Sequence, residues 1–94
     1  MIKTFKDKET KAIFNLNYSK RLPSHLQHIA LRKLNMIDAA EDLKDLIIPP
    51  GNHLESLNGD RSGQHSIRIN SKYRICFIWD DGDVFDVEIA DYHS

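Results

Sequence analysis

The stretch "SIRINSKYRICFIW", residues 66–79, decides the fold. Two short runs rich in β-branched and aromatic residues flank a polar turn at residues 70–72, a pattern typical of a β-hairpin. A two-residue turn would mix isoleucines with cations on one face, whereas a three-residue turn pairs Ile67 with Ile75 and Ile69 with Tyr73. We therefore predict a three-residue turn. The apolar face then consists of Ile67, Ile69, Tyr73, Ile75, Phe77 and Trp79.

The same register places Arg68 and Arg74 opposite each other on the second face of the sheet. Like charges in that position are mildly destabilising, so a hydrophobic core does not explain them. One reading is that both arginines are solvated and pair with Glu88 and Asp86, each exposed pair contributing less than about 1 kcal/mol. The other reading is a phosphate-binding face, because a guanidinium fork matches phosphate oxygens.

A third strand follows the turn at residues 81–83. A three-residue turn here pairs Trp79 with Phe85, Phe77 with Val87 and Ile75 with Ile89, which extends the apolar face. The second face would then collect polar side chains from all three strands. We expect it to carry Arg68, Arg74, Glu88 and Tyr92, with Asp91 and His93 at its edge.

The remainder of the chain supplies one strand and two helices. Residues 1–5 alternate as a short strand, residues 8–15 form about two helical turns, and residues 22–46 repeat apolar side chains at helical spacing, with Ser24 as N-cap. Pro49, Pro50 and Gly51 begin a loop that runs to residue 63. We predict one α+β domain over residues 1–94: a small antiparallel β-sheet (the N-terminal strand plus a C-terminal three-stranded meander) with two α-helices packed on one face.

Composition limits the classes of protein. No apolar run approaches the roughly 20 residues of a membrane span, and the basic start of the chain lacks the apolar region of a signal peptide. The lone Cys76 fits a reducing compartment, so we expect a cytoplasmic protein that binds no membrane. Net charge is −1, yet residues 1–35 carry eight Lys or Arg against two acids. The five histidines never occur at metal-ligand spacing, so we expect no metal and no cofactor.

The chain ends in "DYHS", which supplies a carboxylate, a phenol and an imidazole beside the arginines. Cleavage of RNA through its 2′-hydroxyl needs a base, a cation for the charge that builds on phosphate, and an acid for the departing 5′-oxygen. These residue types favour the phosphate-binding reading over solvated surface pairs.

The series "GDR…SIRIN…RICF…DYH" resembles the HigB-type toxins of bacterial type II toxin–antitoxin systems, within the RelE/ParE superfamily. The likeness runs from "IKTF" through "PPGN" to the final "DYH". It implies the RelE/ParE-like fold and a ribosome-dependent mRNA endonuclease that inhibits translation. It also implies partners: the ribosome and mRNA, and a helix-turn-helix antitoxin of the HigA kind, through which alone the toxin meets operator DNA.

The resemblance also implies roles for individual residues. It places Arg74 at the phosphate and makes Asp91, Tyr92 and His93 acid/base and positioning groups. Supporting contacts to RNA or the ribosome would come from Arg61, Arg68, Lys72, His53 and Glu55. Glu55 stands where some members have a loop histidine, with His53 nearby, and Tyr73 stands where tryptophan is usual.

Two other functions use the same fold. A ParE-like gyrase poison would need no acid/base group at the end of the chain, so "DYH" speaks against it. A non-catalytic binding module would use the arginine face only to hold an acidic partner. Truncation of the C-terminus discriminates, because only the nuclease would lose its activity.

Overall fold

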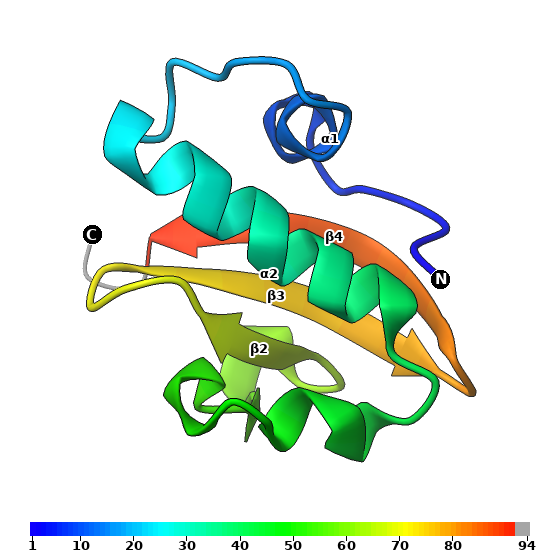
Figure 1. Cartoon of the computed structure of the whole chain (residues 1–94). Helices are drawn as coiled ribbons and strands as arrows, with labels where there is room; N and C mark the ends of the chain where they lie inside the picture. Colours follow the sequence, from blue (N-terminus) through cyan, green and yellow to red (C-terminus); the bar gives the residue numbers. More distant parts are fainter. Residues whose placement is uncertain (92–94) are drawn as a thin grey trace.

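The computed structural model describes residues 1–91; the predicted site residues Tyr92 and His93 lie outside this part (Figure 1). An antiparallel sheet of four strands, in the order β1-β2-β3-β4, carries two α-helices on one face. The helices are α1 (Lys8–Phe14) and α2 (Gln27–Ala39), and the strands are β1 (Glu55–Ser56), β2 (His65–Arg68), β3 (Tyr73–Asp80) and β4 (Asp83–Asp91). Short 3₁₀ helices span Ser24–Leu26 (η1), Leu43–Ile47 (η2), Pro50–Asn52 (η3) and Gly59–Arg61 (η4). No helix in residues 1–91 is long and apolar enough to cross a membrane.

The predicted long helix is shorter than expected. It ends at Ala39 because Ala40 is extended, and a new 3₁₀ turn begins behind Asp42, whose carboxylate forms a reciprocal capping box with Asp45. Ser24 is not an N-cap: it is the first residue of η1, which has no side-chain cap. The apolar face of α2 nevertheless packs on the sheet as expected, with Leu34 and Ile37 fully buried.

The β2–β3 hairpin confirms the predicted register. Ile67 pairs with Ile75 and Arg68 with Arg74. The amide of Ile69 donates to the Tyr73 carbonyl at 2.9 Å, which closes the predicted three-residue turn. Side-chain alternation therefore specified this hairpin correctly, because the two-residue turn would have mixed cations with the isoleucines that pack in the core.

The β3–β4 hairpin is different from the prediction. Asp80 pairs with Asp83, so the turn has two residues, Asp81 and Gly82, both at positive φ as a tight hairpin turn requires. Trp79 consequently pairs with Val84, and the predicted Trp79–Phe85 pair is wrong; Phe85 lies opposite Ile78. A bulge on β4 restores the register: between the pairs Cys76–Glu88 and Ile78–Phe85, Asp86 and Val87 of β4 lie opposite the single residue Phe77 of β3. The predicted Phe77–Val87 pair falls within this bulge, and the predicted Ile75–Ile89 pair is present.

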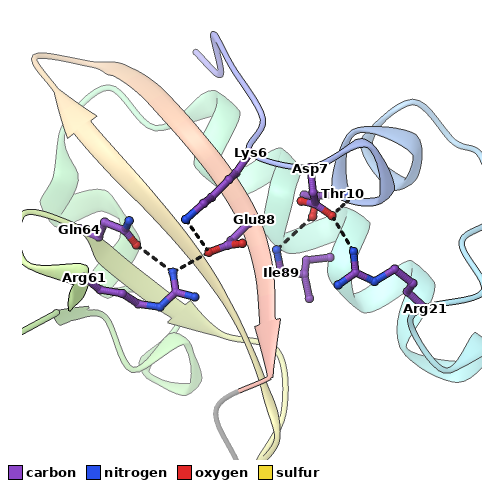
Figure 2. A network of polar contacts seen from close by, with 8 residues as sticks. All are labelled: Lys6, Asp7, Thr10, Arg21, Arg61, Gln64, Glu88 and Ile89. Atoms are coloured by element: carbon purple, nitrogen blue, oxygen red, sulfur yellow. Dashed lines mark hydrogen bonds and ion pairs between the residues drawn. The ribbon is translucent and has the colours of Figure 1, made fainter. Parts of the chain in front are cut away.

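The N-terminal segment forms isolated bridges rather than a regular strand. Ile2 and Phe5 each bridge in parallel to β4, at Val84 and Val87. Further along the same strand, the buried Thr10 of α1 accepts a hydrogen bond from the Ile89 amide at 3.0 Å (Figure 2). These contacts satisfy the outer backbone groups of β4, which would otherwise form an exposed sheet edge.

The segment expected to be a loop contains β1 and two short 3₁₀ turns. It is tied to α2 by Lys33, whose ammonium donates to the side chain of fully buried Asn52. Asn52 in turn donates to the Leu46 carbonyl at 3.1 Å. The contact between Lys33 and Asn52 holds residues 46–52 against α2. It thereby fixes the position from which residues 53–56 reach the sheet.

Candidate active site

The sheet face opposite α2 carries the predicted arginines, and we call it the arginine face. Cα pairing aligns Glu55, Ser66, Cys76 and Glu88 in one row across all four strands. Arg68, Arg74 and Ala90 form the next row. The predicted polar face is present, but its centre is buried, at Ser66, Arg74 and Cys76.

Contacts from the connection between η3 and β2 explain this burial. The carbonyl of His53 accepts a hydrogen bond from Arg74, and Arg61 of η4 reaches Glu88 on β4. Residues 53–64 therefore lie across the arginine face. The sequence predicted a loop for most of this segment. Its residues have no periodic pattern, so the sequence did not indicate that the segment covers the arginine face.

Arg74 is held in a fixed orientation by its neighbours. Its side chain is only about a tenth exposed, and its Nε donates to Ser66 Oγ at 2.8 Å. Its Nη2 donates to the His53 carbonyl and lies 3.9 Å from Glu55 Oε1. These partners differ from those of the solvated reading, which paired the arginines with Glu88 and Asp86. A guanidinium anchored in this way is preorganised, because its plane is set before any ligand arrives.

A second polar cluster surrounds Glu88 on the same face (Figure 2). Arg61 Nη1 lies 2.6 Å from Glu88 Oε1 and donates to Gln64 Oε1 at 3.2 Å. Lys6 Nζ approaches the same Glu88 oxygen at 3.7 Å. Glu88 thus occupies a position between two cations that an RNA phosphate could also occupy.

Asp91 lies on the other side of the sheet from Arg74, although the two residues are close along the strands. Its Cα partner is Tyr73, the residue before Arg74, and strand alternation turns its side chain toward the helices. There it lines a pocket of about 210 Å³ together with Asp7, Thr10 and Ile89. Lys72 Nζ lies 3.6 Å from Asp91 Oδ2.

The remaining predicted residues lie around these two clusters. Arg68 is half-buried opposite Arg74, and Glu55 and the side chain of His53 are exposed. His53 has a left-handed backbone (φ 45°), which directs its carbonyl to Arg74. Tyr92 and His93 lie outside the described residues, directly after Asp91. In residues 1–91 no group of three or more His, Cys, Asp or Glu could hold a metal ion.

Sequence reasoning missed Ser66, Gln64 and Lys6 as parts of these clusters. Ser66 could have been found, because the predicted register already places it on the face of Arg68 and beside Arg74. Gln64 and Lys6 could not, since each reaches its partner across connections that have no periodic pattern.

Comparison with solved structures supports the observed fold. A chain of the heterotetrameric YoeB–YefM toxin–antitoxin complex of Staphylococcus aureus superposes with a TM-score of 0.62 at 19% identity, covering 100% of this chain and 97% of that one. A second YoeB–YefM structure from the same organism gives a TM-score of 0.58. At this identity the likeness shows the fold alone.

Sequence similarity gives the family. Residues 3–93 match the profile of the HigB-like toxins, described as the RelE-like toxin of the type II toxin–antitoxin system HigB. Toxin HigB-1 of Vibrio cholerae is 44% identical over 79 residues, 83% of either chain. Endoribonuclease HigB of Proteus vulgaris is 32% identical over 93 residues, 99% of this chain and 100% of that one. The chain belongs to the HigB-like toxin family, and its partner is accordingly an antitoxin.

Proposed function

We propose that this toxin is an endoribonuclease that cuts translated mRNA in the ribosomal A site. The relative from Proteus vulgaris is named an endoribonuclease, which supports the reaction class. The observation that carries the proposal is the pairing of Tyr73 with Asp91, because it brings the start of the Asp-Tyr-His terminus to the strand end that holds Arg74. We infer that Tyr92 and His93, which follow Asp91 directly in the chain, supply the proton-transfer groups at this strand end, while the Asp91 carboxylate, which faces the helices, positions them.

In this proposal Arg74 stabilises charge on the scissile phosphate as the 2′-oxygen attacks. Asp91, Tyr92 and His93 move protons and position the reacting groups, one removing the 2′-hydroxyl proton and another protonating the leaving 5′-oxygen. The ribosome orients the mRNA in line, which supplies the positional part of the catalysis. No cofactor is needed for this chemistry.

Binding of the substrate is proposed to use the cations around this strand end. Arg68 and Lys72 flank Arg74 on β2 and the 70–72 turn, while Arg61 holds the far side of the face through Glu88. The exposed side chains of His53 and Glu55 border the same surface. We further propose a HigA-like helix-turn-helix antitoxin, operator binding only through that antitoxin, and a cytoplasmic location.

The test is primer extension on a translated message after induction of the toxin without antitoxin. We expect cuts within codons by the wild type and none by a chain truncated after Asp91, which loses Tyr92 and His93. His25→Gln is the matched control, because His25 is an exposed histidine on η1.

Three outcomes contradict the proposal. Equal cutting of naked RNA would remove the ribosome from the mechanism. Full activity of the truncated chain would remove the terminal residues from the site. Unchanged mRNA together with altered DNA supercoiling would favour a gyrase poison.

A further inference from the structure

An open apolar groove lies between the end of α1 and α2. It has a volume of about 280 Å³ and is lined chiefly by apolar and aromatic side chains: Ile13, Leu16, Tyr18 and Leu31, with Asn17, Gln27 and His28. Leu16 is 79% exposed and Tyr18 is 65% exposed. Two large side chains left in water beside one groove are typical of a surface that another molecule covers.

The backbone at Leu16 strengthens this reading. Leu16 has φ 67°, a left-handed conformation that costs a non-glycine residue about 1 kcal/mol and that glycine or asparagine adopts more readily. An exposed leucine here therefore improves neither the stability nor the solubility of the free chain. Strain combined with an exposed apolar side chain points to a binding role.

The segments that form the groove carry an excess of cations, although none of the groove's lining residues is Lys, Arg, Asp or Glu. Between residues 8 and 35 the exposed charged side chains are Lys8, Lys11, Lys20, Arg21 and Arg32. Arg21 pairs with Asp7 at 3.6 Å, and Arg32 lies one turn of α2 from the lining residue His28. The single acid in that range, Glu9, accepts a hydrogen bond from Ser19 Oγ at 2.7 Å. A partner that fits this surface carries carboxylates around at least one large apolar side chain.

We propose that this groove binds an acidic segment of the antitoxin that inserts an apolar side chain against Leu16, Tyr18 and Leu31. The inference rests on membership of a toxin–antitoxin family and extends it to a particular surface. RNA fits less well, because its phosphates match the cations but offer nothing to an aliphatic groove. The groove lies on the helix side of the sheet, so the antitoxin would be held away from Arg74 (Figure 1).

The test compares the wild type with Leu16→Asn, which removes the apolar side chain and suits a positive φ. The probe is the small helix-turn-helix protein encoded beside the toxin gene, titrated against purified toxin by calorimetry. We expect the Kd to rise about tenfold or more, as for loss of an anchoring side chain. The melting temperature should stay the same or rise, and ribosome-dependent cleavage should be unchanged. Ile48→Asn is the matched control, since Ile48 is 74% exposed on another part of the surface.

A charge reversal, Arg32→Glu, tests the acidic character of the segment. It should weaken binding at low salt and have a smaller effect at high salt. The proposal is overturned if Leu16→Asn binds as the wild type does, if Ile48→Asn is the variant that loses binding, or if the wild type does not bind the antitoxin. It is also overturned if Leu16→Asn abolishes a toxin dimer or ribosome binding instead. None of these results alters the cleavage assay, so failure here is distinguishable from failure of the nuclease assignment.

Discussion

Arg74 combines a structural and a proposed chemical role in one side chain. Its hydrogen bonds to Ser66 and to the His53 carbonyl tie together β3, β2 and the segment that covers the arginine face. The same bonds orient the guanidinium toward β2 and the segment that carries His53 and Glu55. A buried arginine that only connects these segments would make the same hydrogen bonds. A measurement must therefore separate the structural role of Arg74 from its proposed chemical role.

Replacement of Arg74 separates them. Arg74→Ala leaves Ser66 and the His53 carbonyl without their donor, so we expect the free energy of unfolding to fall by about 1–3 kcal/mol. At a temperature where the variant is folded, single-turnover cleavage on programmed ribosomes should fall by roughly 10²–10³-fold. Arg74→Lys should recover only part of the rate, because an ammonium lacks the planar fork. A folded Arg74→Ala protein that cleaves within a few-fold of the wild type would assign Arg74 to structure alone.

Glu88 is predicted to restrain RNA binding. Because its carboxylate pairs with Arg61 and Lys6, RNA must displace it before using these cations. Glu88→Gln keeps a hydrogen-bond acceptor and removes the charge. We expect ribosome affinity to increase by roughly threefold to tenfold at low salt, with a change in stability of at most about 1 kcal/mol. Asp83→Asn, an equal change in charge at the far end of β4, should leave the affinity unaltered; equal gains in both variants would indicate a general effect of net charge.

At the scale of elements, the pair between α2 and η3 positions the covering segment. Lys33 is buried, and this burial, together with the charge of nearby Arg32, holds the pKa of its ammonium below the ordinary 10.5. Between that lowered value and 10.5 the unfolded chain binds more protons than the folded chain. The contribution of Lys33 to stability therefore rises with pH across this window.

Lys33→Met tests this linkage by removing the titrating group at similar volume. We expect urea unfolding to give a free energy of unfolding for each protein at several alkaline pH values. The value for the wild type minus that for the variant should increase as the pH rises toward 10.5. Lys8→Met, a change at an exposed position of α1, should give a difference nearly independent of pH. A flat profile for Lys33→Met would mean that the ammonium is solvated in the folded protein.

For the whole molecule, the core separates stability from function. Phe77 is fully buried, whereas Trp79 only packs against the core cluster from a partly exposed position. Phe77→Ala should cost roughly 3–5 kcal/mol, a large share of the 5–15 kcal/mol typical of a small protein. Trp79→Ala should cost less. Thermal melts measure the stability of both variants. Arg68→Ala is the control, and its free energy of unfolding should stay within about 0.5 kcal/mol of the wild-type value. A large loss of stability in Arg68→Ala would show that this arginine supports the fold.

The molecule as a whole places two proposed surfaces on opposite sides of one sheet. The arginine face and the adjoining strand end are proposed for RNA, while the groove between α1 and α2 is proposed for the antitoxin. A toxin arranged in this way can be bound by its antitoxin without direct contact at Arg74.

The sequence by itself determined the parts that local periodicity controls. Alternation between Ile67 and Ile75 admitted one register for the first hairpin, and helical spacing marked the buried face of α2. Tertiary structure decided the rest. Asp81 and Gly82 form a two-residue turn, which the strand pattern did not distinguish from a three-residue turn. The resulting one-residue change in register moved Phe85 off the apolar face.

The same division holds for the candidate site. The sequence placed Arg68 and Arg74 side by side on the correct face, because pairing follows from the hairpin. It did not reveal that residues 53–64 bury Arg74, that Glu88 binds Arg61, or that Asp91 turns toward the helices. These features depend on contacts between residues far apart in the chain, made by segments without a repeating pattern. Their positions are set by packing and by the need to satisfy buried polar groups, which only the assembled fold specifies.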